Sequence, residues 1–317
     1  NMISIVMTHY NRTHLLERTL YSLTLNKTRD FEVVIVDDAS NKEELVKLRK
    51  LKNEYEKHFI IRLITIKETE KWYDNPCIPF NIGLKAAAGE ITIIQNAECY
   101  HLGNIVDYIE KRKDYFEPDP ENTKELNVWG EHNGKYIDPN IQPYRKEFRR
   151  YLSFACYNIS KDQCERLTQN PPHEEMLDII NPIYNHEIVH GEGEGWFDHP
   201  DHRPLGYHWC NVYATEDLKR LKYFDERFSK GTAYDDDDLA FRTKKILNTI
   251  WVNSPLVIHQ WHGLGNYYRN PNQNENQLKQ DYNRCLYEKV TKIENKDGPN
   301  FENVHNKFSP NVRYDEE

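Results

Sequence analysis

The sequence lacks the glycine-rich loops of two common nucleotide-binding folds. Neither Gly-x-Gly-x-x-Gly nor a Walker loop follows the first predicted strand, where the residues read THYNR (8–12). The first pattern cradles the pyrophosphate of a dinucleotide, and the second binds the phosphates of ATP or GTP. A Rossmann dehydrogenase and a P-loop NTPase are therefore both disfavoured.

Long apolar runs and paired cysteines are missing as well. No apolar run approaches the ~20 residues that a helix needs to span a bilayer, and the chain enters a predicted strand without a signal peptide. None of the six cysteines forms a Cys-x-x-Cys pair, which disfavours a zinc ribbon or a thioredoxin-type site. We expect reduced cysteines, no transmembrane segment and a cytoplasmic location.

The chain also has no excess of positive charge. Its 42 Lys and Arg residues against 51 Asp and Glu residues give a formal net charge of -9. A non-specific nucleic-acid binder needs a basic face that displaces counterions, so we expect no nucleic-acid partner. An acidic protein that binds a phosphate-rich ligand needs a compensating cation at the site.

What is present is an alternation of apolar strands and amphipathic helices over the first ~110 residues. Ser40 and Glu43 predict a capping box at the start of the second helix. Continuous apolar strands between helices are typical of a parallel sheet covered on both faces. Predicted strands cover 3–8, 31–36, 59–66 and 90–95, and predicted helices cover 13–25, 40 to about 55, and 81–88.

The rest of the chain is less regular. Residues 115–208 are rich in Pro, His, Asn and Tyr and predict loops over the sheet, and strands return at 209–214 and before VIHQWHG (257–263). We expect one domain over 1–270, with a nucleotide-binding half at 1–110 and an acceptor and catalytic half at 111–270. Residues 271–317 are polar and predict a helical, mobile C-terminal extension with one helix over 275–290.

Polar side chains follow the first two predicted strands, in MTHYNR (7–12) and VVIVDDAS (33–40). Ligands of parallel sheets bind at the carboxyl ends of the strands. Tyr10 offers a ring for a base to lie against, while Thr8 and Asp38 can hydrogen-bond a uracil edge or a ribose. Either segment alone is also typical of a helix cap and an Asx turn, but the two at successive strand ends favour a nucleotide site.

At these residues the sequence resembles the inverting GT-A glycosyltransferases of family 2. The resemblance covers about residues 2–262 and implies a Rossmann-like α/β fold with a mostly parallel central sheet and, here, a polar C-terminal extension. It implies Thr8, Tyr10 and Asp38 as uridine contacts, with Asp37 adjacent. The matching segments are ISIVMTHYNRTHLLERTLYSL (3–23), FEVVIVDDAS (31–40), PFNIGLKAAAGEITIIQN (79–96) and FDERFSKGTAYDDDDLAFR (224–242).

The third segment and the residues that follow it show one further similarity to the family and two departures from it. PFNIG resembles the Asn-x-Gly helix start of galactosyltransferase relatives, which implies that Asn81 and Gly83 lie near the donor. Many family members carry an arginine just before Asn81, where this chain has Phe80. The family also places Asp-x-Asp at the end of the fourth strand to hold a divalent metal, whereas this chain reads Asn-Ala-Glu at 96–98.

A metal site is still predicted at this strand end. Glu98 supplies a hard oxygen ligand, and Asn96 can offer its amide oxygen to the metal or bind a ribose hydroxyl. Relatives often use a histidine after the catalytic helix, which implies His259 or His262; His101 is a third candidate. Imidazole suits Mn²⁺ better than Mg²⁺, so the expected cofactor is Mn²⁺, with Mg²⁺ as the alternative.

The acidic run at 235–238 predicts a catalytic base. Inverting transfer needs a base on the face of the sugar opposite the leaving diphosphate. Carboxylates at a helix start are stabilised by the helix dipole, and residues ~100° apart cannot all face the site. The family pattern implies Asp236 as the base and Asp235 as its neighbour, while Asp238 and Arg242 are expected to form an ion pair.

The predicted function is metal-dependent inverting glycosyl transfer from a nucleotide-sugar, most simply a UDP-sugar, to a hydroxyl of a glycan, lipid-linked or protein acceptor. Two alternatives remain from the sequence. One is a catalytically lapsed sugar- or nucleotide-binding protein, which Asn96 and Phe80 suggest. The other is a nucleotidyltransferase that makes sugar nucleotides, which normally needs a glycine-rich basic loop after the first strand.

Overall fold

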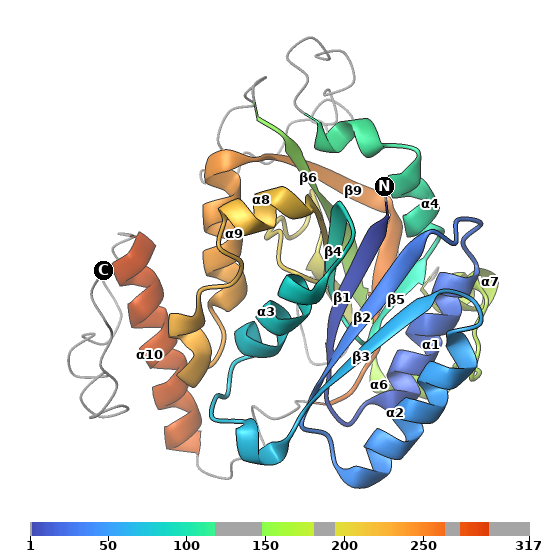
Figure 1. Cartoon of the computed structure of the whole chain (residues 1–317), viewed down its shortest axis with the longest axis horizontal. Helices are drawn as coiled ribbons and strands as arrows, with labels where there is room; N and C mark the ends of the chain where they lie inside the picture. The colour runs from blue at the N-terminus through green and yellow to red at the C-terminus, as the bar shows by residue number, and fades with distance from the viewer. Residues whose placement is uncertain (1, 118–147, 181–193, 264–272, 292–317) are drawn as a thin grey trace.

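The computed structural model describes residues 2–117, 148–180, 194–263 and 273–291 (Figure 1). The strands are β1 (Ile3–His9), β2 (Phe31–Asp38), β3 (Ile60–Ile66), β4 (Ile91–Asn96), β5 (Cys99–Leu102), β6 (Arg150–Asn158), β7 (Gly195–Asp198), β8 (Cys210–Ala214) and β9 (Asn248–His259). The α-helices are α1 (Thr13–Thr24), α2 (Lys42–Tyr55), α3 (Cys77–Ala86), α4 (Ile105–Glu110), α6 (Lys161–Glu165), α7 (His173–Ile180), α8 (Thr215–Arg220), α9 (Asp235–Ile246) and α10 (Gln273–Thr291). Three short 3-10 helices are η1 (Glu68–Glu70), η2 (Lys113–Phe116) and η3 (Glu226–Lys230).

These strands form one curled sheet in the order β3-β2-β1-β4-β8-β6-β9-β5, with β7 paired to β6. The first four strands in this order run parallel, as predicted. β6 and β9 are also parallel, and the remaining pairs are antiparallel. The predicted α/β class with a central sheet is confirmed.

Helices cover both faces of the sheet (Figure 1). Successive side chains of a strand point to opposite faces, so Ile5 and Met7 pack in the core beneath α1 and α2, while Val6 packs beneath α3 and α9. Gly83 allows α3 to approach closely, because a Cβ there would lie 2.6 Å from Cγ1 of Val6. The apolar runs therefore fill two cores, one on each side of β1.

The start of α2 differs from the prediction. Asn41, not Ser40, caps the helix, since its side chain accepts a hydrogen bond from the Glu44 N–H. Ser40 instead donates its hydroxyl proton to Asp37 at 2.6 Å. The capping box with Glu43 is therefore wrong, because the serine is used by a tertiary contact one residue before the cap.

The middle of the chain is more regular than its composition indicated. All nine residues of β6 are buried, and the strand lies between β8 and β9. The prediction of loops over 115–208 is therefore wrong for 150–158, where YLSFACY (151–157) is apolar apart from Ser153 and forms a buried strand. Residues 118–147 and 181–193 of that stretch lie outside the described residues.

The predicted C-terminal helix is present as α10, which packs on the rest of the domain. The ring of Tyr287 lies 5.7 Å from that of Tyr234 and 6.4 Å from that of Phe241, measured between centroids. Residues 292–317 of the predicted extension lie outside the described residues. No helix in the described ranges is long and apolar enough to cross a membrane. All six cysteines are buried and none forms a disulfide, as expected.

Candidate functional site

A cavity of about 640 Å³ lies at the carboxyl ends of β1, β2 and β4. The strand register explains its position, because Thr8 of β1 is paired with Asn96 of β4. Among the predicted site residues, the cavity wall brings together Thr8, Tyr10, Asp38, Asn96 and Glu98. Residues more than 80 positions apart in the sequence thus meet at one edge of the sheet.

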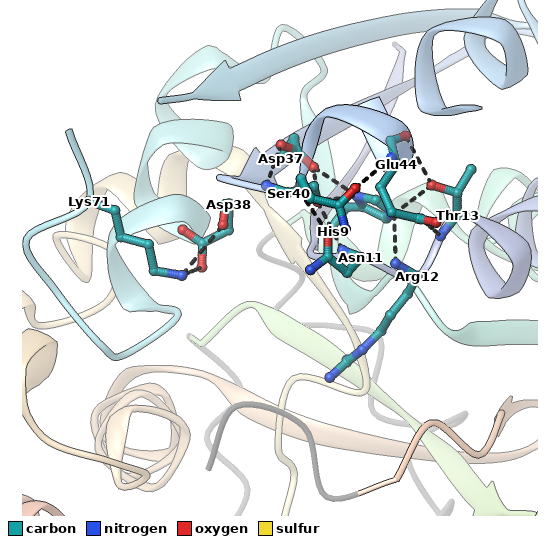
Figure 2. Close-up of polar contacts among 10 residues, drawn as sticks. His9, Asn11, Arg12, Thr13, Asp37, Asp38, Ser40, Glu44 and Lys71 are labelled. Atoms are coloured by element: carbon teal, nitrogen blue, oxygen red, sulfur yellow. Dashed lines mark hydrogen bonds and ion pairs between the residues drawn. The ribbon is translucent and has the colours of Figure 1, made fainter. Parts of the chain in front are cut away.

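The two adjacent aspartates of β2 have different environments (Figure 2). Asp37 is completely buried and accepts hydrogen bonds from Nδ1 of His9 at 2.8 Å and Oγ of Ser40 at 2.6 Å. Asp38 lines the cavity and pairs with Nζ of Lys71 at 2.8 Å. Because neighbouring residues of a strand face opposite ways, Asp38 faces the cavity and Asp37 holds the loop after β1 in place. Asp37 does not line the cavity, so this geometry gives it no direct contact with a sugar donor.

Tyr10 and Lys71 form one side of the cavity with Asp38. Nζ of Lys71 lies 4.9 Å from the centre of the Tyr10 ring. The second oxygen of Asp38 accepts a 2.6 Å hydrogen bond from the Tyr73 hydroxyl, and burial together with Asp38 raises the pKa of that phenol. An aromatic face, a carboxylate and an ammonium group together can hold a base and a ribose.

Asn81 has a structural role instead of a donor contact. It is buried, its Nδ2 donates to the carbonyl of Phe224 at 2.9 Å, and its Oδ1 accepts from the N–H of the same residue at 3.0 Å. Phe80 is also buried and stacks on Phe224 with ring centroids 5.3 Å apart. Neither Asn81 nor Gly83 lines the cavity, and both residues fix α3 to its neighbours, so their placement beside the donor stays a prediction.

Three side chains converge where β4 and β9 end. Oε1 of Glu98 lies 3.3 Å from Nε2 of His259 and 3.2 Å from Nε2 of His262, and the two nitrogens are 3.2 Å apart. The three ligand atoms all lie within 4.8 Å of one another, a spacing suitable for one metal ion. The pairing of β5 with β9 causes this convergence, since it sets Cys99 opposite His259.

The donor set suits a divalent cation. Nδ1 of His259 lies 2.8 Å from Oδ1 of Asn158, which can only accept, so the lone pair of this imidazole is on Nε2 and faces Glu98. Burial lowers the pKa of His259, which favours the neutral form that binds metals. A carboxylate and a lone pair that face each other at this distance are stabilised by a cation between them.

Arg12 is a further cationic group at this position. Its side chain extends away from the His9 and Asp37 cluster (Figure 2), and Nη1 lies 3.1 Å from Oε1 of Glu98. Burial would raise the pKa of Glu98, but the charge of Arg12, followed by that of His262, outweighs burial and holds that pKa well below its usual value. Glu98 is therefore ionised at neutral pH.

His101 is wrong as a metal-ligand candidate. It is fully buried on β5, where Nε2 pairs with Oε1 of Gln95 at 2.7 Å. Burial, aided by His173, lowers its pKa to about 3. The alternation of side chains along β5 turns this histidine into the core, away from the group formed by Glu98, His259 and His262.

The acidic run begins α9, and its four members have different partners. Asp235 is buried and accepts from Nδ2 of Asn75 at 3.0 Å, next to the cavity-lining Pro76. The hydroxyl of Tyr207 donates to Asp237. The expected ion pair of Asp238 with Arg242 is confirmed at 2.8 Å.

The surroundings of Asp236 strengthen its affinity for a proton. Burial, followed by the charges of Asp235 and Asp237, raises its pKa well above the ordinary value of a carboxyl group. A raised pKa makes the deprotonated carboxylate a stronger base. Within the described part of the chain, Asp236 is not among the residues that line the cavity.

Several residues of the site were not predicted from the sequence. Arg12 and Lys71 are single cations whose partners follow only from the sheet order, and Asn158 lies on the strand that composition concealed. His208 lines the cavity without any motif around it. Lys279 of α10 also lines the wall and pairs with Asp74 at 2.8 Å. The one available signal was Arg12, which stands inside the resembling segment MTHYNR.

Comparison with known proteins places the chain in a family. The family model "Glycosyl transferase family 2" matches residues 4–163, just over half of the 317 residues. No match was found among curated protein sequences.

Two solved structures illustrate the structural likeness. A mannosyltransferase from Pyrobaculum calidifontis, in complex with GDP-Man and Mn²⁺, is 16% identical with a TM-score of 0.44; the match covers 94% of this chain and 65% of that one. Residues 1–349 of S. aureus TarS are 17% identical with a TM-score of 0.48, covering 98% of this chain and 73% of that one. On the family match, the chain belongs to glycosyl transferase family 2 and is a glycosyltransferase with a GT-A-like α/β fold.

Proposed function

We propose that this glycosyltransferase moves a sugar from a UDP-sugar to a hydroxyl group of a glycan, lipid-linked or protein acceptor, with inversion at the anomeric carbon and with Mn²⁺ or Mg²⁺. The observation that carries the proposal is that Glu98, which lines the same cavity as Tyr10 and Asp38, converges with His259 and His262. A metal site and a nucleoside site in one cavity fit a nucleoside diphosphate.

The protein's own residues divide the work of binding. Tyr10 supports the uracil ring, and Thr8 and Asp38 bind the base edge or the ribose. Asn96, paired with Thr8 in the sheet, can bind a ribose hydroxyl. Arg12 lies within 3.1 Å of Glu98 and can neutralise a diphosphate oxygen from there.

Glu98, His259 and His262 would hold the divalent cation, which neutralises the diphosphate and stabilises it as it leaves. The acceptor oxygen bonds to the anomeric carbon while the bond from that carbon to the diphosphate oxygen breaks. The electron pair of that bond leaves with UDP, and the hydroxyl proton passes to the carboxylate of Asp236. Asp235, held by Asn75, raises the basicity of Asp236 through its charge.

Calorimetric binding of UDP, with Mn²⁺ and with a chelator, tests the proposal. We expect UDP to bind the wild type only with Mn²⁺, and Glu98→Gln to lose this dependence. Glu68→Gln is the matched control, because Glu68 lines the same cavity without belonging to the metal group. Equal UDP binding in both conditions would remove the metal from the proposal, and no binding in either would remove UDP.

Transfer itself is tested with Asp236→Asn. This variant should keep the UDP affinity of the wild type and lose transfer, because it removes the base without touching the nucleotide contacts. Proton NMR of the product formed by the wild type from an α-linked donor should show a β-linked sugar. Transfer retained by Asp236→Asn would exclude this residue as the base.

A further inference from the structure

His208 lines the cavity, and within the described part of the chain no hydrogen bond fixes its imidazole. Its Nδ1 is buried without a partner, and Nε2 bonds to none of the residues that the structure describes. Polar atoms at this depth normally have a partner. The Nε2 atom is therefore available to a ligand in the cavity, and nothing within the described protein sets its tautomer.

The ring shares the cavity wall with Glu98 of the proposed metal site, and the adjacent Tyr207 donates a hydrogen bond to Asp237 at the start of α9. Burial lowers the pKa of His208, while the negative charges of Glu98 and Asp235, both close enough to act on it, have the opposite effect. A donor with its diphosphate at Glu98 and its anomeric carbon in front of α9 must place its sugar between Glu98 and the start of α9. His208 is then beside the sugar and not beside the nucleoside.

Packing contacts fix the position of the His208 ring, although no hydrogen bond to a described residue fixes its nitrogen atoms. Its ring centroid lies 4.9 Å from that of Phe80 and 5.3 Å from that of Phe224, each ring meeting it edge-on. The preceding loop is held by the buried carboxyl of Asp198, which accepts backbone hydrogen bonds from residues 205–207 at 2.9–3.1 Å. Tyr207 ties the same loop to Asp237. A side chain held this way can discriminate between ligands that differ in the position of one group.

We propose that His208 hydrogen-bonds a hydroxyl group of the donor's sugar and thereby selects which sugar is transferred, an assignment that rests on the proposed function. A neutral imidazole has one nitrogen that donates a hydrogen bond and one that accepts it. A hydroxyl group can both donate and accept, so it can pair with either nitrogen. Asp235, whose carboxylate accepts from Asn75 and pairs with no cation of the described residues, opposes a negatively charged sugar beside His208. The donor class that fits is therefore a neutral hexose or N-acetylhexosamine, not a uronic acid.

Binding of UDP and of four UDP-sugars in Mn²⁺ tests this assignment. The probes are UDP-glucose, UDP-galactose, UDP-N-acetylglucosamine and UDP-glucuronate, and the proteins are the wild type, His208→Ala and His208→Gln. We expect the wild type to prefer one neutral sugar nucleotide over UDP-glucuronate. His208→Ala should bind that nucleotide about tenfold more weakly, the effect of one lost hydrogen bond in a closed site.

UDP serves as the internal control for folding and for the nucleotide site. Its affinity should be the same in the wild type and in His208→Ala, and His208→Gln, which keeps a donor and an acceptor, should retain much of the sugar preference. An equal loss for UDP and the UDP-sugar, an unchanged UDP-sugar affinity, or a preference for UDP-glucuronate would overturn the assignment. Failure of the wild type to bind UDP would instead overturn the proposed function, and the assignment with it.

Discussion

Asn158 gives the most direct test of the proposed metal site, because its side chain contacts the ligand His259 and is not itself a ligand. Its Oδ1 lies 2.8 Å from Nδ1 of His259, and both side chains are buried. Asn158→Ala removes the acceptor that directs the lone pair of His259 toward Glu98. All three ligand side chains stay in the protein, so the variant isolates the effect of orientation on metal affinity.

The size of the effect follows from the hydrogen bond. A neutral hydrogen bond contributes about 0.5–1.5 kcal/mol, and an unpaired buried donor costs about 1–3 kcal/mol. Without metal, the imidazole of the variant can shift its proton to the other nitrogen and escape part of this cost. With metal bound to Nε2 it cannot, so we expect Mn²⁺ to bind about 10–100-fold more weakly, which equals about 1.4–2.8 kcal/mol.

Titration of Mn²⁺ by calorimetry, with free Mn²⁺ checked by electron paramagnetic resonance, measures this change. Asn158→Asp is the matched variant, because a carboxylate at the same place also accepts from Nδ1 and should retain the affinity. Thermal unfolding without metal controls for damage to β6. If Asn158→Ala binds Mn²⁺ as the wild type does while Glu98→Gln does not, His259 is not a ligand in the orientation described.

Three further predictions concern the proposed base, the packing of α10 and the nucleotide. Asp237→Asn removes a negative charge that raises the pKa of Asp236; since transfer needs Asp236 deprotonated, the acidic limb of the kcat–pH profile should move to lower pH, and an unmoved limb would separate that limb from Asp236. Gly231→Ala places a Cβ 2.1 Å from Oδ1 of Asn283 on α10, which should lower the unfolding free energy by about 1–3 kcal/mol. In urea titrations the double variant with Asn283→Ala should be no less stable than Asn283→Ala alone, and additive losses would contradict the clash. Tyr10→Ala should weaken UDP binding about 5–150-fold if the ring stacks on the base, whereas Tyr10→Phe should not; equal calorimetric affinities for all three proteins would exclude stacking.

The sequence predicted which strand-end residues lie together, because its signals there are local. An apolar strand followed by polar residues identifies a carboxyl strand end, so Thr8, Tyr10, Asp38 and Asn96 could be expected together before their contacts were known. The same logic failed for Asp37, because two adjacent aspartates are equivalent in a pattern. Only the direction of each side chain relative to the cavity separates them.

The metal group shows the limit of local signals. Glu98 was predictable from its strand end, and both histidines were candidates, but whether one or both approach Glu98 depends on the pairing of β5 with β9 across the curled sheet. His101 was an equally reasonable candidate until its strand direction placed it in the core. Asn158, which orients His259, had no signal at all because its strand was not recognised.

The sequence by itself determined the α/β class, the parallel direction of the first strands and the positions where polar residues end them, because apolar periodicity and strand ends are properties of short segments. The tertiary structure decided which residues share one cavity. It turned Asp37 inward and Asp38 outward, brought His259 and His262 to Glu98, set Lys279 of α10 on the cavity wall and left His208 facing the cavity. These outcomes depend on contacts between residues tens to hundreds of positions apart, which the order of the sheet fixes and no local pattern records.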